Sequence, residues 1–326
     1  MTSAWGRVVV SLPDSLLPVQ FPCDSWFVGV QTVPDIPPDD LEQIEKWHFA
    51  IGGLDTQQEI LPLGGSFSLH RLRSFPTHEQ LALSLTSLPV AGAMALYGGN
   101  IIQHELVIDA GRFEEHTERI FPTAEAILAG LRICTGAEIV CPAVCERSWA
   151  ALHTNPPNKC RAFHFERGLS HQAGSEPKLL LGDDLDWVRD NLATVIRLTE
   201  NDNFQTAVEA LCTYFLAAND RMKAAQLWAG VEALFGRRLG EVGYRLRVLT
   251  AMLIEEYGPA RRKHYKRFKK LYDTRSDVVH GGKVNPDELF QHLTEVRNLL
   301  ARLLQRIIAL GRFPTDDDFE EMLFEK

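Results

Sequence analysis

Two residues in the C-terminal third of this 326-residue chain have side chains suited to cutting RNA: Arg275 and His280, five positions apart. Histidine exchanges a proton near neutral pH, so His280 could take the proton of a ribose 2′-hydroxyl or give one to the leaving oxygen. Arginine stays charged and can hold a phosphate with two parallel N–H groups while negative charge develops on it. The pair therefore indicates metal-independent cleavage that leaves a 2′,3′-cyclic phosphate.

A basic stretch leads up to this pair, with eight basic residues and one acidic residue in residues 260–275. The rest of the chain is different: residues 1–200 hold 14 Lys and Arg against 25 Asp and Glu, a balance of −11. Residues 201–326 hold 20 against 18, a balance of +2. A local basic stripe attracts phosphate even in a chain whose net charge is −9. The residues expected to bind the RNA backbone are Lys266, Arg267, Lys269 and Lys270.

The spacing of Arg275 and His280 does not by itself identify a site. Five residues of an α-helix correspond to a rise of ~7.5 Å and a rotation of ~140°, so one straight helix places the two side chains on different faces. They could converge where the helix loosens at Gly281-Gly282, or across the two-fold axis of a dimer. Arg73 and His78 have the same spacing in a proline-interrupted loop without a basic stretch, and we interpret that copy as coincidence.

The sequence lacks the motifs of several common chemistries. It has no glycine-rich phosphate loop ending in Lys-Ser or Lys-Thr, no GxGxxG, no GxSxG and no HExxH. A weak metal signal comes from four cysteines within 27 residues, of which only the middle two have zinc-knuckle spacing: Cys134, Cys141, Cys145 and Cys160. Two alternatives stay open for these cysteines, a zinc site and buried reduced thiols. The RNA cleavage expected of Arg275 and His280 is separate from them and requires no metal and no cofactor.

The residues before about 185 indicate a mixed α/β domain interrupted by glycine and proline. The expected strands are residues 26–32, 66–72, 80–88, 105–109 and 162–166. Helices are expected at 41–49 and at 123–134, the second of them capped by Thr123. The Gly-Gly pairs at 52–53, 64–65 and 98–99 are expected to form turns.

From residue 187 onward, apolar residues recur with a helical period. The expected helices are residues 187–199, 203–218, 220–237, 241–257, 260–280 and 286–310. Asp220 is expected to cap the third helix. Pro259 precedes the fifth helix, and Gly281-Gly282 is expected to end it. Asn285-Pro286 is expected to start the sixth helix.

One apolar stripe of the third helix predicts the core of a bundle. It consists of Leu227, Val231, Leu234 and Phe235. The expected fold class is an α+β N-terminal domain (1–185) followed by an all-α helical bundle (186–326).

Two segments resemble the HEPN superfamily, and most closely its Apea-like branch. Residues 271–281 (LYDTRSDVVHG) resemble the Arg-x4–6-His signature, in which an aromatic residue, the arginine with a small polar neighbour, two aliphatic residues and His-Gly follow in order. Residues 225–236 (AQLWAGVEALFG) resemble an earlier family helix with a Leu-Glu-x-Leu-Phe pattern, although Val231 replaces the usual leucine. The resemblance covers about residues 205–310 and does not extend to the N-terminal domain.

The resemblance implies a dimeric HEPN-like bundle that cleaves RNA without metal, often as a bacterial antiviral defence or toxin effector acting on tRNA or mRNA. By position, Arg275 and His280 take the catalytic roles. Ser276 and Asp277 lie where family members often carry a polar accessory residue. Glu232 would either brace Arg275 or simply line the bundle.

Two classes of function stay open. The first is an endoribonuclease; the second is a non-catalytic HEPN-fold interaction or RNA-binding module. Residues 1–185 would then sense a ligand or recognise the substrate. The sequence has neither a run of ~18 apolar residues nor a secretory signal. We therefore expect a cytoplasmic protein that binds RNA, forms a homodimer through the bundle and does not enter a membrane.

Overall fold

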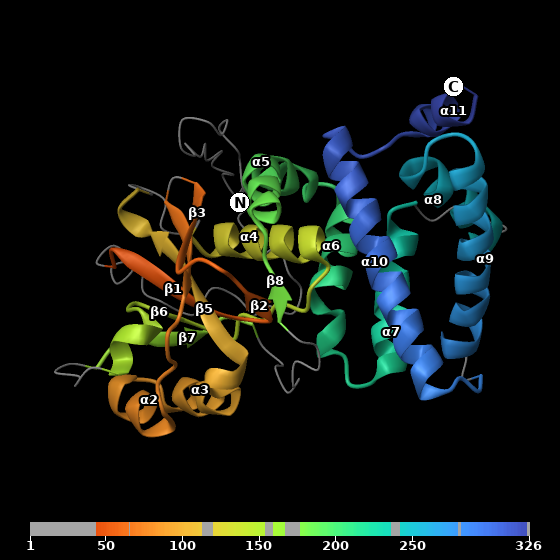
Figure 1. The fold of residues 1–326 in the computed structure, drawn as a ribbon. Helices are drawn as coiled ribbons and strands as arrows, with labels where there is room; N and C mark the ends of the chain where they lie inside the picture. The colour runs from red at the N-terminus through yellow and green to blue at the C-terminus, as the bar shows by residue number, and fades with distance from the viewer. Residues whose placement is uncertain are drawn as a thin grey trace, which may run out of the picture. The chain divides into compact units, whose positions relative to one another are not determined.

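The computed structural model describes residues 44–64, 66–112, 120–153, 159–166, 177–235, 242–279 and 282–324. His280, Gly281 and the strand expected at 26–32 lie outside the described residues. The chain forms two compact units, one of residues 1–131 and 137–197 and one of residues 132–136 and 198–326 (Figure 1). The helix expected to open the C-terminal bundle, α5 (Gly182–Leu198), lies almost entirely in the first unit rather than after a boundary at residue 185.

A six-stranded sheet forms the centre of the first unit, with strand order β3-β4-β5-β1-β6-β7. All neighbouring strands in it are antiparallel. The strands are β1 (Lys46–Gly52), β3 (Ile60–Gly64), β4 (Phe67–Arg71), β5 (Ile102–Asp109), β6 (Ala143–Cys145) and β7 (Ala162–His164). A separate parallel pair joins β2 (Leu54–Asp55) to β8 (Lys178–Leu179). The unit is thus a mixed α+β structure, as expected.

The apolar core of this unit lies on one face of the sheet. Alternate residues of β1 point to the same face, and Trp47 and Phe49 are both fully buried. Phe121 of α4 (Ile120–Thr135) packs edge-on against both, with ring centres 5.3 Å from Trp47 and 5.8 Å from Phe49. The N-terminal part of α4 therefore covers the apolar face.

Glu105 of β5 fastens a loop to the sheet. Its carboxylate accepts hydrogen bonds from the Ser148 hydroxyl and the Trp149 backbone N–H, each at 2.9 Å. His48 Nδ1 lies 3.2 Å from the same carboxylate. Burial acts to raise the pKa of Glu105, but His48 and the two donors outweigh it and hold the pKa below its usual value. The buried charge thus anchors the short 3-10 helix η3 (Trp149–His153).

The strand expected at 80–88 is wrong, because a helix begins there. The Thr77 hydroxyl accepts from the Gln80 backbone N–H at 3.3 Å, and the Thr77 N–H donates to the Gln80 side chain at 2.8 Å. This capping box starts α2 (His78–Ser84), which α3 (Leu88–Ile101) follows. Gly98-Gly99, expected to be a turn, lies within α3.

Two further helix expectations need correction. The short helix expected at 41–49 is replaced over its described part by β1, because its alternating apolar residues pair with β5. The helix expected at 123–134 is confirmed as α4, but it begins at Ile120, so Thr123 is a fully buried residue of the first turn and not its cap. The strands expected at 66–72, 105–109 and 162–166 are confirmed as β4, β5 and β7.

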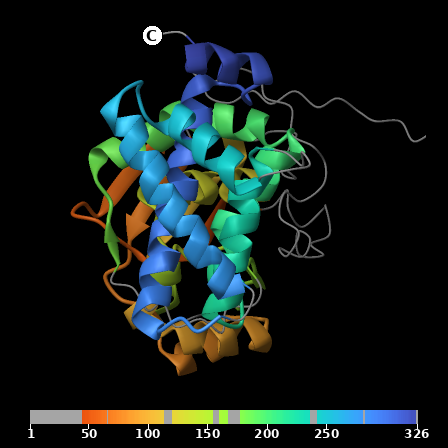
Figure 2. The ribbon, with the colours of Figure 1, turned by 90° about the vertical axis from the view of Figure 1, so that its right-hand side faces the viewer.

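The second unit is helical, and the expected helices are confirmed to within a few residues (Figure 2). They are α6 (Asp202–Thr213), α7 (Asp220–Ala233), α8 (Val242–Ile254), α9 (Pro259–Val279) and α10 (Pro286–Leu310). The expected helix at 203–218 ends earlier, at Thr213, and the 3-10 helix η4 (Tyr214–Leu216) follows it. A further helix, α11 (Asp316–Phe324), was not among the expected helices. Asn285 caps α10 as expected, whereas α7 is capped by Asn219, one residue before the expected Asp220. Among the described residues, no helix is long and apolar enough to span a membrane.

The four residues expected in the core of this unit are confirmed as buried: Leu227, Val231, Leu234 and Phe235. Beside them, Gly230 marks a close approach of three helices. A Cβ atom at Gly230 would lie 2.7 Å from Ala210 Cβ of α6 and 2.9 Å from Leu300 Cδ2 of α10. Since real Cβ contacts are longer, α7 packs this closely against α6 and α10 only because residue 230 has no side chain.

Candidate functional site

Arg275 lies on the inward face of α9. Phe268 of the same helix is 2% exposed, and Arg275 follows it by seven residues, or about two helical turns. Both side chains therefore point to the same side of α9. The Arg275 side chain is 22% exposed, so it is enclosed by the bundle but reachable from solvent.

Arg275 forms an ion pair with Glu232 of α7, with 2.6 Å between Nη2 and Oε1. The Glu232 side chain is 32% exposed. The pair is not aligned as a hydrogen bond, and Arg275 Nε is buried without an acceptor among the described residues. The guanidinium carbon also lies 5.3 Å from the centre of the Tyr272 ring, a cation–π distance. One carboxylate and one ring thus hold the guanidinium.

An aromatic cluster fixes Tyr272 beneath Arg275. Trp228 of α7 meets Tyr272 and Phe268 edge-on, with ring centres 5.4 and 5.7 Å apart. Phe268 and Tyr272 stack at 6.2 Å. At Gly243 of α8, a Cβ would lie 2.8 Å from Tyr272 Cε1. Tyr272 is therefore packed against Trp228, Phe268 and the backbone at Gly243, and it supports Arg275 from within this cluster.

His292 of α10 completes the support of Trp228. The indole N–H of Trp228 donates to His292 Nε2 at 3.0 Å. His292 is 3% exposed. Burial lowers its pKa to about 4, although Glu295 acts in the opposite direction. His292 is therefore neutral at neutral pH and accepts with Nε2. The sequence did not single out this residue, because its role depends on contact with a helix 64 positions away.

The C-terminal end of α9 is held by a residue of α7 that the sequence did not indicate. Arg221 donates from Nη1 to the Val278 carbonyl at 2.7 Å and from Nη2 to the Gly282 carbonyl at 2.7 Å. A longer contact of 3.3 Å reaches the Asp277 carbonyl. In the sequence, His280, the second expected catalytic residue, falls between Val278 and Gly282, and it is outside the described residues.

Gly282 closes the same helix end. Its backbone N–H donates to the Asp277 carbonyl at 2.7 Å. A bond over five residues is typical of a glycine-terminated helix. A Cβ at Gly282 would lie 2.9 Å from both Cα and Cβ of Asp277, so this approach requires glycine.

The four residues expected to contact RNA are all exposed on α9. Lys266, Lys269 and Lys270 have no ion-pair partner among the described residues. Arg267 differs, because it pairs with Glu295 of α10 at 3.4 Å. Two exposed residues one turn earlier, Arg262 and Lys263, extend the basic face but were not in the expected set.

The basic face and Arg275 lie on different sides of α9. Lys270 precedes Arg275 by five residues, which corresponds to a rotation of ~140°. The exposure of Lys270 and the partial burial of Arg275 agree with this separation. The structure therefore does not bring the expected RNA-binding lysines and Arg275 onto one face of the helix.

The expected accessory residues divide into two groups. Ser276 and Asp277 are exposed on α9, and the described contacts of Asp277 are made by its backbone carbonyl. Glu232 is the accessory residue that contacts Arg275 directly. Of the four expected catalytic and accessory partners of Arg275, Glu232 alone is shown to reach it among the described residues.

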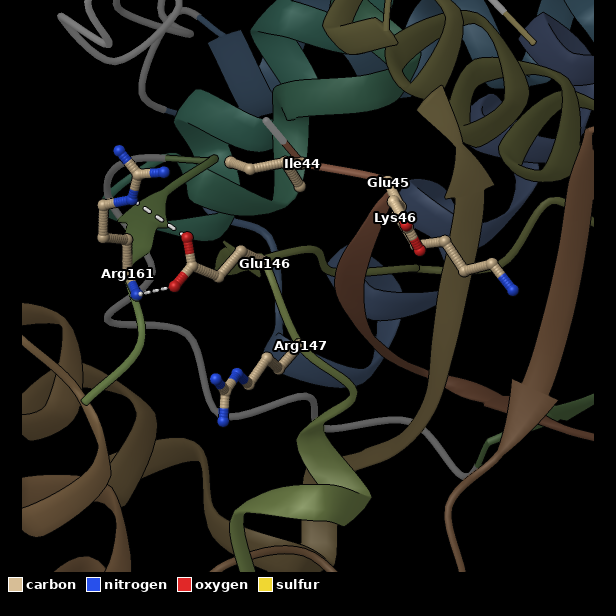
Figure 3. A pocket seen from close by; sticks show the side chains of 6 residues that line it. All are labelled: Ile44, Glu45, Lys46, Glu146, Arg147 and Arg161. Atoms are coloured by element: carbon tan, nitrogen blue, oxygen red, sulfur yellow. Dashed lines mark hydrogen bonds and ion pairs between the residues drawn. The ribbon is translucent and has the colours of Figure 1, made fainter. Parts of the chain in front are cut away.

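A separate pocket of about 400 Å³ lies in the first unit (Figure 3). Arg161 on its wall is already bound to Glu146, with N and Nε each 2.9 Å from a carboxylate oxygen. The side chains of Lys46 and Arg147 point in different directions in Figure 3. The charges that line the pocket therefore do not converge on one point.

The cysteines supply no metal centre in the part of the chain that the structure describes. Cys145 and Cys160 place their sulfur atoms 3.7 Å apart, and Cys141 is buried. Over the described residues, no group of three or more His, Cys, Asp and Glu side chains is placed to hold a metal ion.

Comparisons with protein families, curated proteins and solved structures give no match to this chain.

Proposed function

We propose that this chain is a metal-independent endoribonuclease with a HEPN-like C-terminal bundle. Arg275 stabilises the phosphate, and His280 transfers the proton that allows the 2′-hydroxyl to attack and the 5′-oxygen to leave. The observation that carries the proposal is the 2.6 Å ion pair between Arg275 and Glu232, close to the end of the helix that leads to His280. It holds a partly exposed guanidinium in one orientation against Glu232 and Tyr272, as phosphate stabilisation requires.

The substrate class is RNA, with tRNA or mRNA as the candidates. A 2′-hydroxyl is required as the nucleophile, so DNA of the same sequence binds but is not cut. Exposed lysines on the outer face of α9 supply an electrostatic contact to the phosphate backbone. An antiviral or toxin role rests on the HEPN resemblance alone.

A homodimer through the bundle would bring two α9 ends together. Two exposed apolar side chains support contact at this end: Met222 of α7 is 54% exposed and Phe290 of α10 is 70% exposed. Both belong near the end of α9, because Arg221 reaches Gly282 and α10 begins at Pro286. Burying such side chains against a second copy is favourable.

The proposal is tested by incubating purified protein with total RNA in EDTA, beside three variants. Cleavage is expected from wild type and from Lys223→Gln, which loses an ion pair of 2.9 Å with the exposed carboxylate of Asp220. No cleavage is expected from His280→Ala or Arg275→Ala. Fragments should end in a 2′,3′-cyclic phosphate. Intact RNA in every sample, or equal cleavage by the His280 variant, would overturn the proposal.

One observation favours a second candidate, a non-catalytic module with a ligand-sensing N-terminal unit. The charge of Arg275 is already paired with Glu232, and its guanidinium already packs on Tyr272. An arginine of this kind can serve the fold alone. Under this alternative, Arg275→Ala lowers stability while the protein still binds RNA or a partner protein and never cleaves.

A further inference from the structure

Arg221 ties α7 to the chain on both sides of residue 280. Its guanidinium contacts the carbonyl groups of Val278 and Gly282 at 2.7 Å each. The last carbonyl groups of a helix lack partners within the helix, and a cation there also interacts favourably with the helix dipole. Arg221 supplies both the donors and the positive charge.

A second contact limits the path of the chain at the same place. The Gly282 N–H is bonded to the Asp277 carbonyl at 2.7 Å, and the Gly282 Cα approaches too closely for any side chain. The positions of residues 278 and 282 are thus fixed relative to each other and to α7. Three residues, 279–281, separate these two fixed points in the sequence.

Arg221 and Glu232 belong to the same face of α7. They are eleven residues apart, which corresponds to ~16 Å along the helix and a net rotation of only ~20°. Glu232 contacts Arg275, and Arg221 contacts the residues that flank His280. One helix therefore contacts α9 at both places that the proposed reaction requires.

We infer that Arg221 is a positioning residue of the cleavage reaction, an inference that rests on the proposed function. Arg221 acts through the backbone carbonyl groups of Val278 and Gly282, and so holds the chain before and after position 280 against α7. The described contacts of Arg221 go to backbone carbonyl groups at residues 277, 278 and 282, and none goes to the lysines proposed to bind the RNA backbone. Its loss should therefore lower kcat and leave KM nearly unchanged, since misplacement by about 1 Å costs on the order of 100-fold in rate.

The test compares the steady-state kinetics of RNA cleavage for wild type, Arg221→Gln, Arg221→Lys and Lys223→Gln. Arg221→Gln should lose ~10- to 100-fold in kcat with KM within about two-fold. Arg221→Lys, which retains the charge and one donor direction, should recover part of that loss. Lys223→Gln lies two residues away on α7, removes the same charge and should match wild type.

Hydrogen exchange and circular dichroism separate positioning from unfolding. In Arg221→Gln, exchange should rise at the Gly282 amide while the helical signal and the exchange of α6 and α10 stay as in wild type. If Arg221→Gln unfolds, the kcat of Arg221→Lys, which disturbs the fold less, tests the positioning role in its place.

The outcomes distinguish the two proposals. If wild type cleaves RNA and both Arg221 variants have the same kcat as wild type, the positioning role is overturned and the proposed nuclease function stands. A rise in KM without a fall in kcat would also overturn it, because it would place Arg221 in RNA binding. A wild type that never cleaves, or whose cleavage survives His280→Ala, would overturn the proposed function and this inference with it.

Discussion

The ion pair between Glu232 and Arg275 predicts a measurable coupling of the two side chains. We consider Glu232→Gln, Arg275→Met and the double variant. Glutamine keeps the shape of glutamate, and methionine keeps most of the aliphatic stem that packs near Tyr272. Each single change removes the same 2.6 Å contact and leaves one charge without its partner.

The size of the coupling follows from distance and burial. Two unit charges about 4 Å apart attract by ~4 kcal/mol where the effective dielectric constant is 20. Desolvation and side-chain ordering offset part of this, and exposed pairs retain only about 0.2–1 kcal/mol. With side chains 22% and 32% exposed, this pair lies between the exposed and the buried limits. We expect a coupling free energy of about 1–2 kcal/mol.

The assay is urea unfolding of the four proteins, followed by far-UV circular dichroism at 0.1 M and 1 M NaCl. The double variant should be less destabilised than the sum of the single variants by the coupling free energy. Because the pair is partly shielded from water, about half of the coupling should remain in 1 M salt. A coupling below about 0.5 kcal/mol would show that the contact contributes no more than an exposed surface pair.

Three other predictions follow from the second unit. Gly230→Ala should destabilise the protein by about 1–3 kcal/mol in urea unfolding, although alanine favours helices, because its methyl group would lie 2.7 Å from Ala210; Gly182→Ala, with open space around it, should cost nothing. His292 has a pKa of about 4 when folded against an ordinary 6.5, so the unfolded chain takes up the proton first as the pH falls. The contribution of His292 to the free energy of unfolding is complete above pH 6.5 and is lost as the pH falls toward 4. The free energy of unfolding should therefore fall by about 2 kcal/mol between pH 7.5 and pH 5. Urea unfolding of His292→Gln at these two pH values should lack that loss, and an equal loss would contradict the assignment. Replacing Lys266, Lys269 and Lys270 together with Gln should reduce the salt dependence of RNA binding, measured by fluorescence anisotropy, by a slope of about 2, whereas Arg267→Gln should change it less, since Glu295 already pairs with that residue. An unchanged slope in the triple variant would remove the outer face of α9 from RNA binding.

The helical unit could be predicted well from the sequence, because its signals are local. The apolar period of Leu227 and Val231, and the Asn285-Pro286 start signal, act within one or two helical turns. The capping signal before α7 was misplaced by one residue because Asn219 and Asp220 are both good caps. In the first unit, the capping box of Thr77 and Gln80 was a local signal that sequence reasoning overlooked.

The candidate site was only partly accessible to sequence reasoning. Arg275 could be found from its motif, and Glu232 from a second motif in the resembling segment. Arg221 carries no motif, and its role depends on reaching carbonyl groups 57 and 61 positions away. The same limit applies to Gly243 and His292, whose functions depend on which helices become neighbours. The separation of the lysines from Arg275 was not predicted, although the helical period contains that information. The pairing of Arg267 with Glu295 has no local signal in the sequence.

At Gly230, three helices meet without space for one additional carbon atom. α7 therefore cannot rotate or slide against α6 and α10 unless the seam opens, and these three helices behave as a fixed frame. A rearrangement that switches the C-terminal unit on or off would then consist of α9 moving against this frame. Such a movement would break the polar contacts of Arg221 and Glu232 with the chain at α9, and it would also disturb the packing of Trp228 on that helix.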